Sequence, residues 1–134
     1  MHLGRVHLVV GVVGMLAFAG TGQWLAHHSP PLREYAPFLR ALYRSRHLYL
    51  MFGAGLNTLL GLYWQERVGW RRQAQRLGSA LVLAAPAFAL VGFVRDPVAG
   101  TLAGALFGRL AAFAAFGGTV LHVLSALRLP AARR

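Results

Sequence analysis

Cysteine and lysine are absent from the 134-residue chain, and only three acidic residues occur in it. Without cysteine there are no disulfides, iron–sulfur clusters, thiolate metal sites or covalently attached c-type haem. With so few carboxylates, the sequence offers no acid–base pair and no activated nucleophile. If the protein is an enzyme, we therefore expect a membrane oxidoreductase whose chemistry belongs to a cofactor.

All fourteen basic residues are Arg, and the formal net charge is +11. Such a charge is typical of proteins that bind nucleic acid. Here, however, long uncharged runs separate the Arg residues, and 57% of the chain is hydrophobic. A span of the hydrocarbon core takes about 20 apolar residues. We therefore expect a lipid bilayer and no nucleic acid as the partner. The predicted fold is a single all-α domain, a transmembrane four-helix bundle with spans at about 6–26, 45–65, 77–94 and 101–127.

The connections between the spans predict the topology. Prolines break the first connection, and Arg95-Asp96-Pro97 is expected to form a tight third one. An up-down-up-down arrangement with a cytoplasmic N-terminus places eight Arg residues inside and five outside. Cytoplasmic loops carry the excess of Arg. This favours two cytoplasmic termini and a multi-pass protein of the bacterial inner membrane.

Small residues recur at steps of three and four in the first and fourth spans. In the first span Gly11 and Gly14 follow His7, and in the fourth Gly118 precedes His122. Such faces mark helix contacts in membranes, so they predict packing within the bundle or a homodimer. A histidine within a span is expensive unless it has a partner, and by default it suggests a functional site.

His7 and His122 are predicted at the same, inner side of the membrane. One interpretation is that both imidazoles bind the iron of a flat macrocycle, for which Gly11, Gly14 and Gly118 leave a slot. The alternative is that each imidazole is hydrogen-bonded to a neighbouring helix.

The remaining candidates lie nearer the outer side. His47 is either a residue of the basic interface or an outer ligand, with Arg46 available to pair with a cofactor carboxylate.

Arg109 either extends toward the interface or binds a cofactor carboxylate or quinone oxygen. It is thirteen residues from His122, about 20 Å along a helix. His27 and His28 with His47 suggest metal binding or simple interfacial solvation.

The segment Arg5-Val6-His7, followed by an apolar run and Thr21-Gly22, is similar to the opening of the bacterial cytochrome b561 family. The resemblance implies a helical bundle that holds b-type haem between histidines. It pairs His7 with His122 around one haem and makes His47 the second-helix ligand of another. Where that second haem needs a fourth-helix histidine, this chain has Gly108 and Arg109. The resemblance therefore implies one haem b and leaves the second in doubt.

Three functions remain open from the sequence. The first is a b-type cytochrome-like protein that exchanges electrons with quinone or a redox protein. The second is a cofactor-free structural or assembly protein whose glycine faces serve packing. The third is a small metal- or solute-handling membrane protein that uses the outer His and Arg residues.

Overall fold

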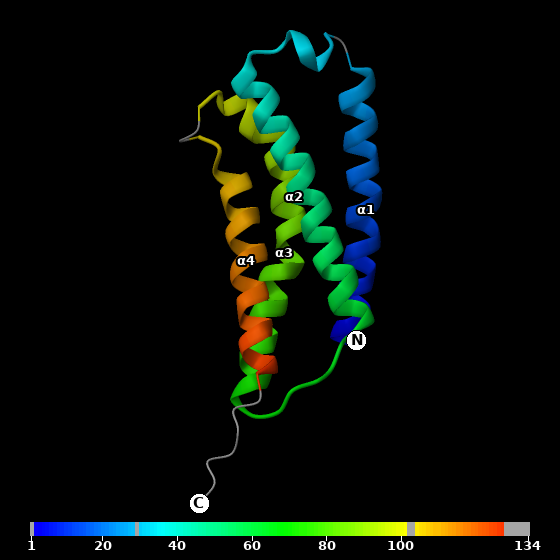
Figure 1. Cartoon of the computed structure of the whole chain (residues 1–134), viewed down its shortest axis with the longest axis vertical. Coiled ribbons are helices and arrows are strands. Elements are labelled where there is room, and N and C mark those ends of the chain that lie inside the picture. Colours follow the sequence, from blue (N-terminus) through cyan, green and yellow to red (C-terminus); the bar gives the residue numbers. More distant parts are fainter. Residues whose placement is uncertain (1, 29, 102–103, 128–134) are drawn as a thin grey trace, which may run out of the picture.

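The computed structural model describes residues 2–28, 30–101 and 104–127, and this part of the chain contains helices and no strands. The helices form one bundle, in which the start of α1 and the end of α4 lie at the same end, the lower end in Figure 1. The predicted helical bundle is thus confirmed. The elements are α1 (Leu3–His27), η1 (Leu32–Glu34), α2 (Pro37–Leu62), α3 (Trp70–Ala99) and α4 (Leu106–Ala126).

Three helices are longer than their predicted spans, α2 and α3 most of all, and α4 is shorter because it begins at Leu106. Helix α2 begins at Pro37 instead of near Ser45, because proline is well suited to the first turn of a helix, where no N–H is needed. Helix α3 runs through Arg95, Asp96 and Pro97 to Ala99. The prediction of a tight connection at these three residues was wrong. The helix ends instead at Gly100, whose φ of 66° lies in the left-handed region that glycine adopts freely.

The helices pack mainly as neighbours in the sequence. Helix α3 makes its most extensive contact with α4, and α1 makes its own with α2. Helix α2 also packs on α3 and joins the two pairs, while α1 touches α3 only sparingly. Among the described residues α1 and α4 make at most marginal contact, so the bundle is open along that side.

Close glycine contacts hold these pairs together. A Cβ atom at Gly11 would lie 2.7 Å from the backbone nitrogen of Thr58, and one at Gly14 would lie 2.8 Å from Cβ of Ala54. At Gly118 it would lie 2.7 Å from the carbonyl oxygen of Gly78. No larger side chain fits at these positions without a shift of the neighbouring helix. The small-residue faces therefore pack α1 on α2 and α4 on α3.

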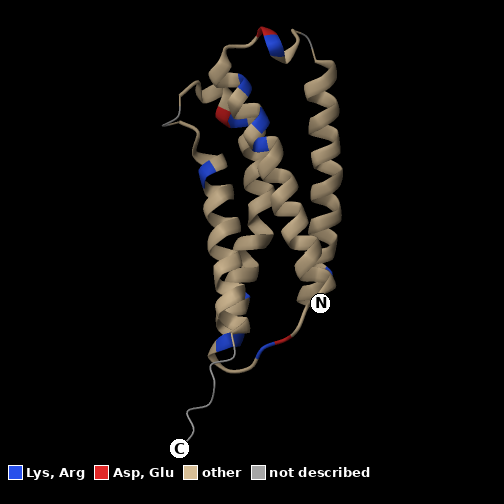
Figure 2. Ribbon diagram, in the orientation of Figure 1, with Lys and Arg blue, Asp and Glu red and all other residues tan. Residues whose placement is uncertain are grey.

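Three helices, α1, α3 and α4, are long and apolar enough to cross a membrane. Helix α2 carries Arg40, Arg44 and Arg46 in its first half. Figure 2 shows the charged residues near the two ends of the bundle, with an uncharged middle. Large apolar side chains such as Phe113 and Phe116 are more than 70% exposed on α4. A surface of this kind is typical of a protein that contacts lipid.

Candidate functional site

His7 is fully buried at the lower end of the bundle, and Asn57 of α2 fixes its orientation. The amide nitrogen of Asn57 donates to the carbonyl oxygens of Gly53 and Val82, each at 2.8 Å. The amide oxygen of Asn57 therefore faces Nδ1 of His7, 2.7 Å away. Because that oxygen can only accept, Nδ1 of His7 carries the proton. In the neutral ring Nε2 then presents a lone pair.

That Nε2 atom of His7 is buried and has no hydrogen-bond partner. Buried polar atoms are nearly always paired, so an unpaired one requires an explanation. The imidazole of His122 lies close by, with 6.1 Å between the two ring centroids and 75° between the ring planes. The structure thus brings together the two histidines, 115 positions apart, that the sequence proposes as partners.

Trp64, at the end of α2, contacts both imidazoles. Its ring centroid lies 5.5 Å from that of His7 and 6.1 Å from that of His122. The indole nitrogen of Trp64 is also buried without a hydrogen-bond partner. On its other side, Nε2 of His122 is 3.2 Å from the hydroxyl oxygen of Ser79 on α3. Neither Trp64 nor Ser79 was predicted from the sequence to be part of the site.

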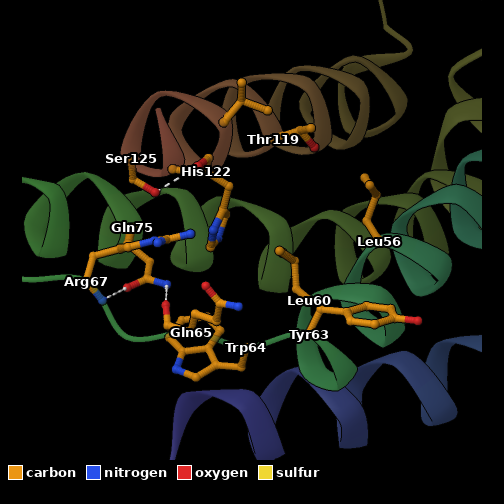
Figure 3. Close-up of a pocket in the computed structure, with 12 residues that line it drawn as sticks. Leu56, Leu60, Tyr63, Trp64, Gln65, Arg67, Gln75, Thr119, His122 and Ser125 are labelled. Atoms are coloured by element: carbon orange, nitrogen blue, oxygen red, sulfur yellow. Dashed lines mark hydrogen bonds between the residues drawn. The ribbon is translucent and has the colours of Figure 1, made fainter. Parts of the chain in front are cut away.

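A cavity of about 260 Å³ opens beside His122 and Trp64, between α2 and α4 (Figure 3). Its polar end includes Gln75, whose side chain donates to the carbonyl oxygen of Gln65 at 2.7 Å and accepts from the backbone N–H of Arg67 at 3.0 Å. These bonds fix the α2–α3 connection beneath the cavity. The lining residues are Leu56, Leu60, Tyr63, Trp64, Gln65, Arg67, Gln75, Thr119, His122, Val123, Ser125 and Ala126.

The glycines predicted to flank the histidines do not line this cavity. Gly11 and Gly14 lie against α2, and Gly118 lies against α3, with no room for a side chain. The free volume lies beside His122, between α2 and α4, and His7 does not line it.

His47 belongs to the opposite, upper end. Its Nδ1 is 2.9 Å from the hydroxyl of Thr21, and its ring stacks on Phe18 with 4.1 Å between centroids. Thr21 follows His7 by fourteen residues in α1, about 21 Å along the helix. His47 is therefore not part of the His7–His122 site.

The other upper histidines each contact their own helix. Nδ1 of His27 is 3.0 Å from the carbonyl oxygen of Gln23, and Nδ1 of His28 is 3.1 Å from that of Trp24. Within the part of the chain that the structure describes, no group of three or more His, Cys, Asp or Glu side chains is placed to hold a metal ion.

Arg46 and Asp96 form a buried ion pair that the sequence reading missed. Nε of Arg46 donates to Oδ2 of Asp96 at 2.7 Å, and the two side chains are 7% and 0% exposed. Asp96 also accepts from the backbone N–H groups of Phe107 and Gly108, at 3.2 and 2.8 Å. The sequence predicted that Asp96 lies in a connection between helices, which was wrong, because Asp96 is a buried residue of α3. Arg46 is thus occupied by Asp96, on α3, and by the hydroxyl oxygen of Ser45 at 3.0 Å.

Arg109 follows Gly108 at the upper end of α4, with an exposed side chain. It interacts with other residues of the protein, and its position thirteen residues before His122 in α4 puts it about 20 Å along the helix from the His7–His122 site.

The chain was compared with models of protein families, with curated proteins and with solved structures, and none of the three comparisons found a match. The functional argument therefore depends on the geometry of the site.

Proposed function

We propose that the protein is a redox protein of the bacterial inner membrane that holds one b-type haem between His7 and His122. One observation carries the proposal. His7 is oriented by Asn57 so that a buried, unpaired nitrogen lone pair lies beside a second histidine. An enzymatic role, if there is one, is that of a membrane oxidoreductase.

His7 and His122 are the residues that would hold a haem iron, through their imidazole nitrogens. Histidines that bind metals almost always donate their other ring N–H to a carbonyl or carboxylate, as His7 does to Asn57. The two ring centroids lie 6.1 Å apart, so His7 and His122 are close enough that both would hold one haem iron after a change in their side chains. His122 would exchange its contact with Ser79 for the metal.

The space around the donors requires one rearrangement. The cavity of about 260 Å³ is smaller than typical cofactor pockets of about 300–1,000 Å³. Trp64 contacts both imidazoles and must turn away to admit a macrocycle. Since its indole N–H has no partner, this movement breaks no hydrogen bond of that side chain. The cavity between α2 and α4, which borders His122, is where a macrocycle would enter.

A haem bound here would supply one-electron transfer, and the surrounding residues would tune its reduction potential. Asn57 fixes the ring orientation and tautomer of His7, and a carbonyl-type oxygen on Nδ1 makes Nε2 more basic. Arg67 beside the cavity supplies positive charge near the site. Quinone or a second redox protein is the partner class we propose for electron exchange.

The test is an absorption spectrum of the detergent-purified protein, expressed with added haem precursor, before and after dithionite. We expect a reduced b-type α-band that disappears in His7→Ala and in His122→Ala. His27→Ala is the matched control, because His27 lies at the other end with its ring bonded to its own helix. A colourless wild-type protein would refute the proposal.

A cofactor-free structural or assembly role is the second candidate. It is favoured by the close packing at Gly11, Gly14 and Gly118 and by Trp64, which already contacts both histidines. This hypothesis predicts a folded, colourless protein in which His7→Ala lowers stability by leaving the amide oxygen of Asn57 without its partner.

A further inference from the structure

A second hollow runs along the face between α1 and α3, away from the histidine site. It consists of two adjoining cavities of about 390 and 300 Å³ that share Leu90 of α3. We call this the α1–α3 groove. One wall is formed by Gly14, Ala17 and Gly20 of α1, and the floor includes Leu50 of α2.

The length and lining of the groove suit an extended hydrocarbon chain. On α1 it reaches from Val9 to Trp24, which is about 22 Å at 1.5 Å per residue. Half of a hydrocarbon core of about 30 Å is about 15 Å, so the groove is longer than one leaflet is deep. Gly14, Ala17 and Gly20 leave the middle of the α1 wall free of large side chains. A helix with its side chains is about 10–12 Å wide, which is too bulky for cavities of this size.

The upper mouth of the groove is amphipathic. Trp24 and Tyr43 lie there with 5.2 Å between ring centroids, and Thr21 adds a hydroxyl group. Aromatic residues of this kind prefer the boundary between hydrocarbon and headgroups. Arg40 stands one helical turn before Tyr43 on the same face of α2, and Arg44 follows Tyr43 directly. Neither Arg makes an ion pair with any residue that the structure describes.

We propose that the α1–α3 groove binds one acyl chain of an anionic phospholipid whose phosphate pairs with Arg40 and Arg44. Guanidinium groups bind phosphate oxygens with charge-assisted hydrogen bonds. The nearest buried acid, Asp96, is already neutralised by Arg46, so it does not compete for these two cations. The inference depends on the membrane location proposed above and is independent of haem.

Gly20 allows a sharp test of the groove. An added Cβ atom at Gly20 meets nothing within 4 Å, so we expect Gly20→Leu to obstruct the upper half of the groove while leaving the helix contacts in place. The matched control is Ala19→Leu, since Ala19 is an exposed neighbour at the same depth that does not line the groove. The headgroup is tested with the double variant Arg40→Gln/Arg44→Gln.

Each protein is delipidated in detergent, and phosphatidylglycerol or phosphatidylcholine is added back in steps. Native mass spectrometry then counts the bound lipids. We expect one tightly bound phosphatidylglycerol on the wild type and on Ala19→Leu, and at least a tenfold weaker affinity in Gly20→Leu and in the double Arg variant. Phosphatidylcholine should bind at least tenfold more weakly than phosphatidylglycerol to the wild type.

Equal binding of the two lipids would overturn the headgroup assignment, and unchanged binding in Gly20→Leu would overturn the groove assignment. Helical circular dichroism of each variant checks that a loss of lipid is not a loss of fold. The same mass spectra show whether haem is present. A wild type with the lipid but without haem contradicts only the proposed function, and one with haem but without the lipid contradicts only this inference.

Discussion

Removal of one partner from the Arg46–Asp96 pair tests how the upper end of the bundle is held together. The carboxylate of Asp96 accepts from Arg46 of α2 and from two backbone N–H groups of α4. Helix α4 has no side-chain cap of its own, because Ala105 stands at its N-cap position. Asp96 therefore connects three helices with one side chain. It also offsets the positive end of the α4 dipole.

The expected loss follows from the burial of the pair. With side chains 7% and 0% exposed, neither charge can be solvated if the other is removed. Breaking a buried pair in this way costs about 3–5 kcal/mol. We expect a loss of this size in Arg46→Met. Asp96→Asn should lose a similar amount, because it keeps an oxygen for the α4 N–H groups but leaves the guanidinium unpaired. The double variant should lose less than the sum of the two, by about 1–3 kcal/mol.

The free energy of unfolding is measured in mixed micelles by denaturant titration and followed by tryptophan fluorescence. Arg95→Met is the control, because Arg95 is exposed beside Asp96 on α3 and should change stability by less than about 0.5 kcal/mol. Losses below about 1 kcal/mol in both single variants, or strictly additive losses in the double variant, would refute this account of the pair.

Three further substitutions test other contacts. Asn57→Leu removes the bond to His7 and leaves the Val82 carbonyl unpaired, so unfolding in micelles should become about 1–3 kcal/mol easier. Haem affinity, measured by titration of the absorbance, should fall about 10–100-fold, and an unchanged affinity would contradict the role given to Asn57. Gly11→Ala should lower the thermal midpoint of unfolding, because the added Cβ meets the α2 backbone. Gly20→Ala, where the added Cβ meets nothing, should leave that midpoint unchanged or raise it. The reverse order of the two midpoints would contradict the packing of α1 on α2. Glu66→Gln should leave the midpoint within error, since the 3.6 Å contact of Glu66 with His2 is solvent-exposed, and a marked drop would be unexpected.

The helices were predictable because their signal is local. Uncharged apolar runs locate all four, and the glycine steps identify the faces that pack. The ends were less predictable because they depend on tertiary contacts. A charged Asp96 next to Pro97 reads as a connection, and the helix continues there only because Arg46 lies opposite in the folded bundle. No sequence pattern within α2 or α3 predicts that Arg46 pairs with Asp96.

In the candidate site, too, some features were predictable from the sequence and others depend on the tertiary structure. The placement of His7 and His122 at one end follows from counting along two antiparallel helices, and the structure brings their rings to 6.1 Å. The hydrogen bond between His7 and Asn57 was not predicted, because it depends on the rotation of α2 about its axis. The contact of Trp64 with both rings could not be predicted either, since Trp64 stands just past the end of α2, where the helical period no longer applies.

The start of α4 is fixed by a residue outside α4, and this affects how the chain is built. A ribosome makes Arg46 first, Asp96 fifty residues later and the N–H groups of Phe107 and Gly108 after that. Each group is therefore synthesised when its partner in the preceding helix is already present. When Asp96 joins the bundle, the guanidinium of Arg46 is already present to neutralise its carboxylate. That carboxylate is then in place to accept from the first N–H groups of α4. The order of synthesis matches the order in which these charges need one another.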